Sequence, residues 1–194
     1  LTSEIETTLD VWDEKFADVG ARVGDARARL VAQLTPHVMQ AYEVLAGRPT
    51  PIDLIYEPEW RRPGLAAALA AARTDDVRRG VSTVGPHRDE LEINLKGMPA
   101  KSTGSQGECR TLALALRLGV HRLVTDLVGQ APLLVLDDVL SELDPHRATA
   151  LLGHLPPGQV IITTASPLPP AARPDSVIRI ENGAVVGTET GGAQ

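Results

Sequence analysis

Two adjacent carboxylates, Asp137 and Asp138, are the side chains of this sequence best placed to do chemistry. They directly follow the apolar run of residues 133–136, which Pro132 precedes. An uninterrupted apolar run of this length predicts a strand buried on both faces, as in a parallel sheet. Open α/β sheets bind ligands at the carboxyl ends of their strands. The pair therefore fits a Walker B element, in which Asp137 holds Mg²⁺ through its water shell and Asp138 orients or deprotonates the attacking water.

A second candidate site lies upstream, where small polar residues open a predicted helix. Ser105, Gln106, Gly107 and Glu108 stand directly before the helical run of residues 109–118. Such residues leave backbone N–H groups free at the positive end of the helix dipole, where anions bind. Taken alone, Asp137 and Asp138 also fit a buried strand that ends in a solvated acidic turn. The upstream motif favours the nucleotide site instead.

Residues 105–108 resemble the signature motif of ATP-binding-cassette (ABC) ATPases, whose Ser and Gly contact the γ-phosphate of ATP held by the opposite subunit. The D-loop follows Walker B in that superfamily, and four residues here resemble it: Ser141, Glu142, Leu143 and Asp144. The three motifs occur in the right order, which makes the combination specific. The resemblance implies ATP and Mg²⁺ as cofactors and an ATP-dependent homodimer.

The sequence is most similar in its motifs to one family of that superfamily, the RecF recombination mediators of bacteria. Residues 135–144, continuing through Arg147 to Leu151, resemble the C-terminal signature of RecF. The stretch Gly-Pro-His-Arg-Asp at 85–89, followed by Leu91, resembles one that RecF proteins carry before the signature loop. The likeness extends, less distinctly, over about residues 9–183.

The resemblance implies an ATP-dependent, DNA-binding mediator of recombination and repair, active in gap repair, replication-fork maintenance and the SOS response. It implies gapped double-stranded DNA and RecR- and RecO-type proteins as partners, in the cytoplasm at the nucleoid. Asp138 stands where most ABC transporters carry Glu, which favours a slow DNA-dependent ATPase that uses ATP as a dimer switch.

Two alternatives remain open. The same motifs would serve a noncatalytic, nucleotide-gated DNA clamp or scaffold, or another head of the SMC or Rad50 kind. The SMC and Rad50 reading is weakened by the lack of sustained heptads in the sequence.

One motif of the superfamily does not occur among the 194 residues. No GxxxxGK followed by Ser or Thr is present, so no P-loop Lys can hold the β- and γ-phosphates. The sequence also begins at Leu1. We therefore expect a C-terminal part of a longer protein, with the Walker A half outside it.

The composition of the chain limits which binding partners and which cellular compartment are expected. The net charge of −6 argues against a general nucleic-acid-binding surface. Residues 60–101 nevertheless carry eight basic residues against five acids, and phosphate contacts need only local positive charge. Arg78, Arg79 and Arg88 are the candidate DNA contacts, with an ordinary solvated surface as the alternative. The single cysteine, Cys109, suits a reducing compartment, and no apolar run approaches 18 residues, so no membrane contact is expected.

The pattern of the chain predicts two parts and an α/β fold. Residues 1–81 read as part of a helical second lobe, and 82–194 as the C-terminal part of an ABC-type head, a mostly parallel sheet flanked by helices. The helix over 3–46 is expected to break or kink at Thr35-Pro36 and to end at Gly47. The other predicted elements are a strand at 52–56, a helix at 65–72, a half-exposed strand at 91–95 with a turn at 96–97, a signature helix to about 126, a helix from 145, buried strands at 159–164 and 177–180, a tight turn at 181–184 and a frayed tail at 188–194.

Overall fold

The longest element of this computed structural model, which describes residues 3–191, is helix α1 (Ser3–Ala46). Its C-terminal half buries Val38, Tyr42 and Leu45 at helical spacing, and it packs along helix α4 (Gln106–Val128). Gly47 ends the helix with a φ of +68°, a left-handed conformation that glycine adopts without strain. The predicted helix over 3–46 and its end are confirmed.

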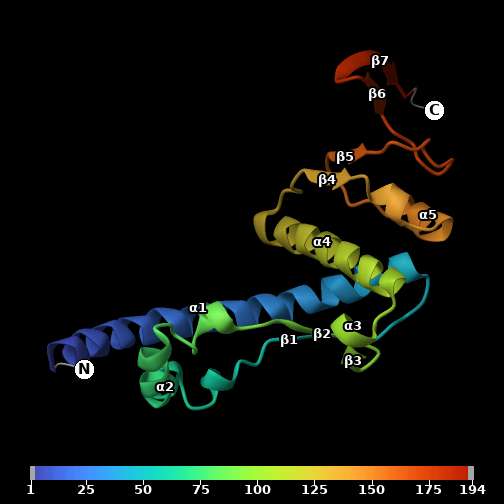
Figure 1. The fold of residues 1–194 in the computed structure, drawn as a ribbon. Coiled ribbons are helices and arrows are strands. Elements are labelled where there is room, and N and C mark those ends of the chain that lie inside the picture. The colour runs from blue at the N-terminus through green and yellow to red at the C-terminus, as the bar shows by residue number, and fades with distance from the viewer. Residues whose placement is uncertain (1–2, 192–194) are drawn as a thin grey trace.

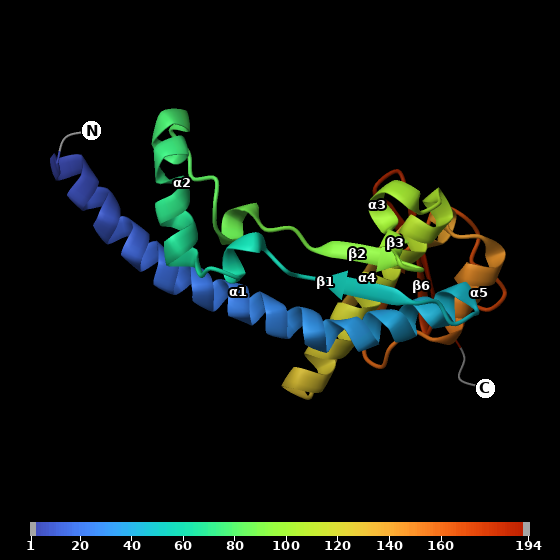
Figure 2. The same cartoon turned by 90° about the horizontal axis from the view of Figure 1, so that it is seen from below.

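Helix α1 runs through Pro36 without a break, so the expected break is wrong. Proline removes one backbone N–H and crowds the preceding turn. The hydroxyl of Thr35 bonds to the carbonyl oxygen of Val31 at 2.8 Å, and buried Leu34 and Val38 anchor the helix on both sides of the proline. The helix is curved instead of broken (Figure 2).

A small antiparallel sheet lies beside the C-terminal half of α1 (Figure 2). Its strands are β1 (Ile52–Ile55), β2 (Glu92–Leu95) and β3 (Met98–Pro99). Lys96 and Gly97 join β2 to β3 with positive φ angles of 57° and 76°, the values of a tight hairpin turn. The strand and turn predicted there are confirmed.

Three short helical turns and one longer helix complete this part of the chain. Helix α2 (Leu65–Arg79) packs beside the N-terminal half of α1, and it extends well beyond the predicted 65–72. The short elements are η1 (Glu59–Arg61), η2 (Pro86–Arg88) and α3 (Ala100–Thr103).

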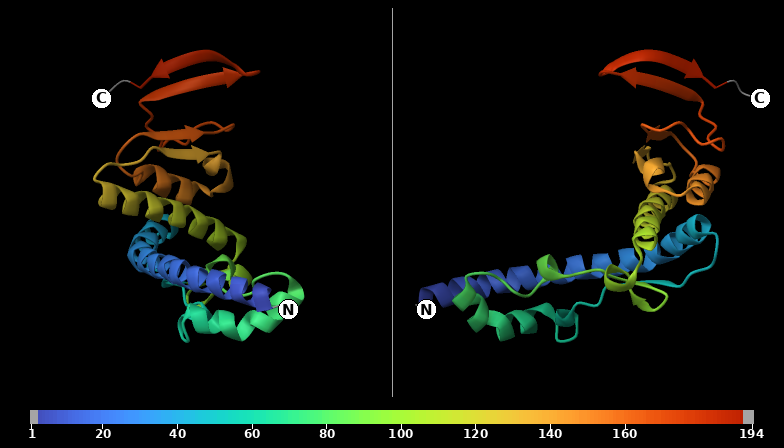
Figure 3. Two further views of the ribbon diagram at one scale, coloured as in Figure 1. Left: turned by 90° about the vertical axis from the view of Figure 1, so that its left-hand side faces the viewer. Right: turned by 45° about the vertical axis from the view of Figure 1, so that its right-hand side comes forward.

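Strand β4 (Leu134–Asp137) pairs in parallel with β5 (Val160–Thr163), with Asp137 opposite Thr163. Between them run η3 (Val139–Glu142) and helix α5 (Pro145–Gly153). Helices α4 and α5 lie on one side of this pair (Figures 1 and 3). Leu134 and Leu136 are buried on that side, but Val135 is 55% exposed.

The prediction that β4 and β5 are buried on both faces is therefore wrong for this chain. Each strand has a single hydrogen-bonded neighbour, and no described element covers the face that carries Val135 and Ile161. Apolar runs indicate two-sided burial only where both faces are covered.

The last two strands, β6 (Ser176–Glu181) and β7 (Ala184–Thr190), form an antiparallel hairpin. Asn182 and Gly183 make the predicted tight turn, both with positive φ. The expected burial of residues 177–180 is wrong, because Ile178 and Ile180 are 60% and 66% exposed in a sheet of two strands. The tail is also paired rather than frayed as far as Thr190, and residues 192–194 lie outside the described ones.

The α/β class is confirmed: the described residues form helices together with one parallel sheet, β4–β5, and two antiparallel sheets. One apolar cluster joins the C-terminal half of α1 to strands β1, β2, β4 and β5 and to α4 and α5, and a smaller cluster of Trp60, Leu65 and Leu69 packs near Ala17 of α1. Helix α1 contributes to both. No helix among residues 3–191 has the length and apolar character needed to cross a bilayer.

Candidate functional site

Asp137 and Asp138, the predicted Walker B acids, lie at the carboxyl end of β4, and both side chains are exposed. The hydroxyl of Thr163, at the end of β5, donates a hydrogen bond to Asp137 Oδ1. Asp138 has a φ of +48°, a left-handed conformation that aspartate tolerates better than most residues. Its amide donates to the carbonyl oxygen of Thr163 at 3.1 Å. The chain thus turns sharply after Asp137 while the backbone of Asp138 stays tied to β5.

The D-loop residues follow at once. Ser141 donates from its hydroxyl to the carbonyl oxygen of Asp138 at 2.8 Å, which closes η3 onto the Walker B turn. Asp144 caps α5 by accepting from the amide of Arg147 at 2.9 Å and from its guanidinium at 2.6 Å. Hydrogen bonds from Arg147 hold the pKa of Asp144 below its usual value. Leu143 is half-buried, while Ser141 and Glu142 are exposed.

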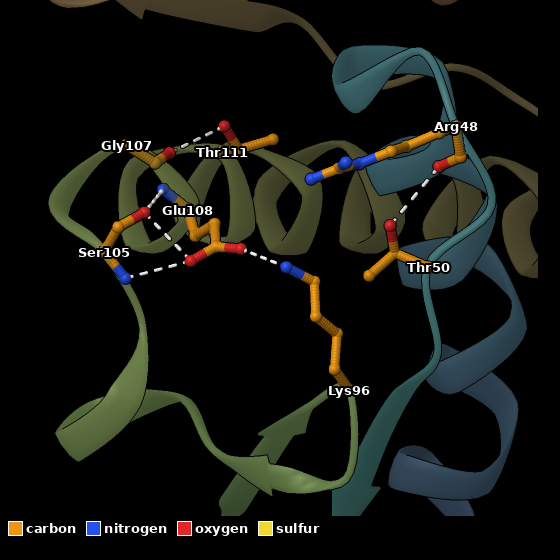
Figure 4. A network of polar contacts seen from close by, with 7 residues as sticks. All are labelled: Arg48, Thr50, Lys96, Ser105, Gly107, Glu108 and Thr111. Carbon is orange, nitrogen blue, oxygen red and sulfur yellow. Dashed lines mark hydrogen bonds and ion pairs between the residues drawn. The ribbon is translucent and has the colours of Figure 1, made fainter.

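The signature residues begin helix α4, as predicted. Ser105 is the N-cap, and its hydroxyl accepts from the amide of Glu108 at 3.2 Å (Figure 4). Glu108 Oε2 in turn accepts from the Ser105 amide at 3.0 Å and from its hydroxyl at 2.9 Å. This reciprocal arrangement is a capping box, which satisfies backbone donors that a helix start otherwise leaves open. Ser105 and Gln106 are exposed, and Gly107 is half-buried.

A lysine that the sequence analysis did not assign joins this site. Lys96, in the turn between β2 and β3, places its Nζ 2.5 Å from Glu108 Oε1 (Figure 4). The hydrogen bond from Lys96, followed by those from Ser105, lowers the pKa of Glu108 to about 2. Glu108 is therefore ionised at any physiological pH.

The structure brings the signature helix and the D-loop together. Arg110 Nε lies 3.6 Å from Glu142 Oε2, and a β-carbon placed on Gly107 would be 3.4 Å from Arg147 Nη1. Within residues 3–191, no hydrogen bond or ion pair joins residues 105–108 to Asp137 or Asp138. The signature and Walker B are thus separate surfaces of this chain, and the D-loop, which follows Walker B in sequence, contacts the signature helix.

The three arginines predicted to contact DNA share no partner among the contacts described below. Arg78 pairs with Asp75 at 2.7 Å, and Arg79 is exposed in the last turn of α2. Arg88 donates to the carbonyl oxygen of Ser82 at 3.2 Å.

The Gly-Pro-His-Arg-Asp stretch instead supplies a buried hub. Asp89, only 3% exposed in its side chain, accepts hydrogen bonds from Trp60 Nε1 at 2.7 Å and from the hydroxyl of Tyr56. Arg27 of α1 lies 3.6 Å from the same carboxylate. Asp89 therefore ties three segments together, a role that no local pattern around it in the sequence signals.

Possible metal ligands are sparse. No group of three or more His, Cys, Asp or Glu residues among residues 3–191 is arranged to hold a metal ion. Asp137 offers one carboxylate oxygen, Oδ2, that receives no hydrogen bond from the described residues. A single carboxylate suits Mg²⁺, which usually keeps several waters and binds nucleotide phosphates as well.

No protein-family model matches the sequence. Solved structures do match the fold. A structure of the recombination mediator protein RecF-ATPrS in the RecFOR pathway has a TM-score of 0.77 and 29% identity, covering 93% of this chain and 50% of that one. Its RecF-ATP counterpart has a TM-score of 0.75 and 27% identity, covering 92% and 50%. An SmcHead bound to the C-winged helix domain of ScpA matches in fold alone, with a TM-score of 0.51 and 16% identity over 84% of this chain and 44% of that one.

The fold and the motifs together define the class: an α/β fold with separate parallel and antiparallel sheets, similar to that of RecF and SMC head structures. Within that class the chain resembles RecF. Proteins named DNA replication and repair protein RecF are 43% identical in Streptomyces avermitilis, over 82% of this chain and 45% of the relative, and 39% identical in Rippkaea orientalis, over 75% and 41%. The chain spans about half the length of these curated relatives, and the match is consistent with their C-terminal half.

Proposed function

We propose that residues 1–194 form the C-terminal part of an ATP-dependent, DNA-binding mediator of recombination and repair of RecF type. The similarity to relatives named for DNA replication and repair, and to RecF-ATP structures, supports this proposal. In it, residues 1–81 belong to a helical second lobe and 82–194 to the head. The Walker A half, whose motif the sequence lacks, lies in the part of the protein that these residues do not include.

One observation carries the proposal. The signature residues 105–108 are exposed or half-exposed at the start of α4, next to the D-loop and without a contact to the Walker B acids. A motif in that position is suited to reach the nucleotide of a second copy rather than its own. ATP would then join two heads, because it binds the dimer better than the monomer.

The cis side of the pocket would use the Walker B acids. Mg²⁺ accepts hard oxygen ligands and commonly one or two carboxylates, so Asp137 would hold it through water or directly. Asp138, on the left-handed turn beside it, would orient the attacking water as a general base. The bound metal would supply charge stabilisation for the phosphoryl group.

DNA and protein partners complete the proposal. Arg78, Arg79 and Arg88 would contact the phosphates of gapped double-stranded DNA, where local positive charge suffices despite the net charge of −6. RecR- and RecO-type proteins would be partners of the dimer, and recombination and SOS functions at the nucleoid would follow from the same assignment. A noncatalytic nucleotide-gated clamp is the alternative, since the exposed signature serves binding equally well without hydrolysis.

Two measurements separate these functions. Residues 1–194 alone should bind ATP no tighter than millimolar by calorimetry, because they supply only half of the pocket. A longer chain in which a Walker A segment precedes this sequence is called the joined chain. The joined chain should bind ATP, and it should hydrolyse ATP faster with double-stranded DNA than without it. A joined chain that dimerises with ATP but never hydrolyses it would favour the clamp. Micromolar ATP binding by residues 1–194 alone would contradict the division of the pocket.

A further inference from the structure

The two donors that Ser105 would offer to a phosphate, its amide and its hydroxyl, are already engaged within the chain. Both the amide and the hydroxyl of Ser105 donate to one oxygen of Glu108, at 3.0 and 2.9 Å (Figure 4). A carboxylate is an anion with two acceptor oxygens, so it makes the same kind of contact that a phosphate oxygen would make. A nucleotide phosphate and the Glu108 carboxylate therefore compete for Ser105.

Each carboxylate oxygen of Glu108 has its own partner. The helix geometry fixes it three residues after the N-cap, and Lys96 binds its other oxygen, Oε1, at 2.5 Å. Lys96 itself is fixed by the hairpin turn, since its backbone has a positive φ and its neighbour Leu95 pairs with Met98. The ammonium group thus pairs with Glu108 from an element 12 residues away in the sequence.

The remaining charges near the start of α4 are cationic or already paired. Arg147 lies beside Gly107 but is engaged by Asp144, and Arg48, near the end of α1, adds a further positive charge. The ring of Tyr42, buried below, senses all of these charges: burial and then Glu108 raise the pKa of its hydroxyl, while Lys96, Arg147 and Arg48 lower it. Glu108 is therefore the acid among these groups that lies against Ser105, and Lys96 is its direct counter-ion.

We propose that Glu108 is an intramolecular stand-in for the phosphate at the signature serine, and that Lys96 is a positioning residue that sets how strongly Glu108 opposes the nucleotide. This inference rests on the proposed function, in which Ser105 contacts ATP across a dimer. When the phosphate arrives, the hydroxyl of Ser105 turns its proton from Glu108 to the phosphate, and Lys96 retains and neutralises the displaced carboxylate.

The charges of the pair give opposite expectations for two variants. Glu108→Gln keeps the capping box, which accepts Gln as well as Glu, but removes the competing anion. Lys96→Met leaves Glu108 charged without its counter-ion beside the triphosphate. An exposed charge pair changes binding by about two- to fivefold, and two signature sites in a dimer square that factor. We expect Glu108→Gln to tighten ATP-dependent dimerisation by about 4- to 25-fold and Lys96→Met to weaken it by a similar factor.

The double variant tests whether Lys96 acts through Glu108. Without the carboxylate there is nothing for Lys96 to neutralise, so Lys96→Met with Glu108→Gln should dimerise as tightly as Glu108→Gln alone. Glu92→Gln and Lys101→Met make the same charge changes on exposed residues nearby and serve as matched controls, with no expected effect. Circular dichroism checks that all variants keep their helix content.

The experiment is sedimentation velocity on the joined chain with a slowly hydrolysed ATP analogue, over a range of protein concentrations. Tighter dimerisation of Glu108→Gln and full recovery in the double variant support the inference. An unchanged or weakened Glu108→Gln, or a double variant as weak as Lys96→Met, overturns it. Ser105→Arg, run in parallel, separates the two claims: if it dimerises normally the proposed function fails, and if it does not, only the role of Glu108 and Lys96 is in question.

Discussion

The hydroxyl of Thr163 donates a hydrogen bond to the carboxylate of Asp137, so the strand after Walker B holds the first Walker B acid in place. Residues that orient a metal-binding carboxylate commonly change metal affinity by about 10- to 100-fold when they are removed. Thr163→Val should therefore weaken Mg²⁺ binding to the nucleotide-bound joined chain by about that factor, measured by Mg²⁺ titration of ATP-analogue binding. Thr164→Val, in which the lost hydroxyl contacts only Ser166, is the control. Equal losses in both variants would contradict a specific role for Thr163.

The second Walker B acid should matter for hydrolysis more than for assembly. If Asp138 orients the water, Asp138→Asn in the joined chain should lower the turnover of ATP by at least about 10²-fold, the usual scale for a positioned base. Dimers should still form with ATP and should last longer, because hydrolysis no longer ends them. Steady-state ATPase assays and dissociation rates measure the two effects. Turnover equal to the parent's would show that another residue activates the water.

The buried hub at Asp89 predicts a large effect on stability. Asp89→Ala leaves the indole of Trp60 and the hydroxyl of Tyr56 without their acceptor, and a buried donor left unpaired costs about 1–3 kcal/mol. We expect the free energy of unfolding to fall by roughly 2–4 kcal/mol, measured by urea unfolding of residues 1–194. Asp75→Ala, which loses only an exposed pair with Arg78, should change it by less than about 1 kcal/mol. Similar losses in the free energy of unfolding for Asp89→Ala and Asp75→Ala would show that the buried contacts of Asp89 contribute no special stability.

The lowered pKa of Glu108 predicts a pH dependence of stability with a definite sign. Hydrogen bonds from Lys96 and Ser105 lower the pKa of Glu108 from 4.5 to about 2, so the folded state binds a proton less readily than the unfolded state. The resulting stabilisation is fully present above pH 4.5 and is lost as the pH falls towards 2. The difference in urea midpoint between the parent and Glu108→Gln should therefore shrink between pH 6 and pH 3. A difference that stays constant over that interval would mean that Lys96 and Ser105 do not favour the ionised carboxylate.

Local rules predicted much of the fold and the motifs. The Asn182-Gly183 turn, the end of α1 at Gly47 and the start of α4 after Ser105 depend on residues within a few positions, and all three are confirmed. The sequence left open whether the helix breaks or kinks at Pro36, and packing of Val38 on α4, a tertiary effect, favours the continuous helix.

The rest depended on contacts between distant residues. Lys96 reaches Glu108 from a separate hairpin, and Trp60 reaches Asp89 across 29 residues, so no spacing rule could pair them. Burial of β4 was overestimated for the same kind of reason. Val135 is as apolar as a residue in a strand that is buried on both faces. Its exposure, however, depends on whether another element covers that face of the sheet.

The central claim is that residues 105–108 contact nucleotide only across a dimer interface. Ser105→Arg places a bulky cation at that interface and removes a hydroxyl donor, while it leaves the Walker A and Walker B side of the pocket intact. The most direct measurement is sedimentation velocity of the joined chain carrying Ser105→Arg, with and without a slowly hydrolysed ATP analogue, beside calorimetry of ATP binding. We expect the variant to bind ATP normally but to stay monomeric and lose turnover. A variant that dimerises normally with ATP would show that residues 105–108 are only a helix cap, and would contradict the assignment of the site.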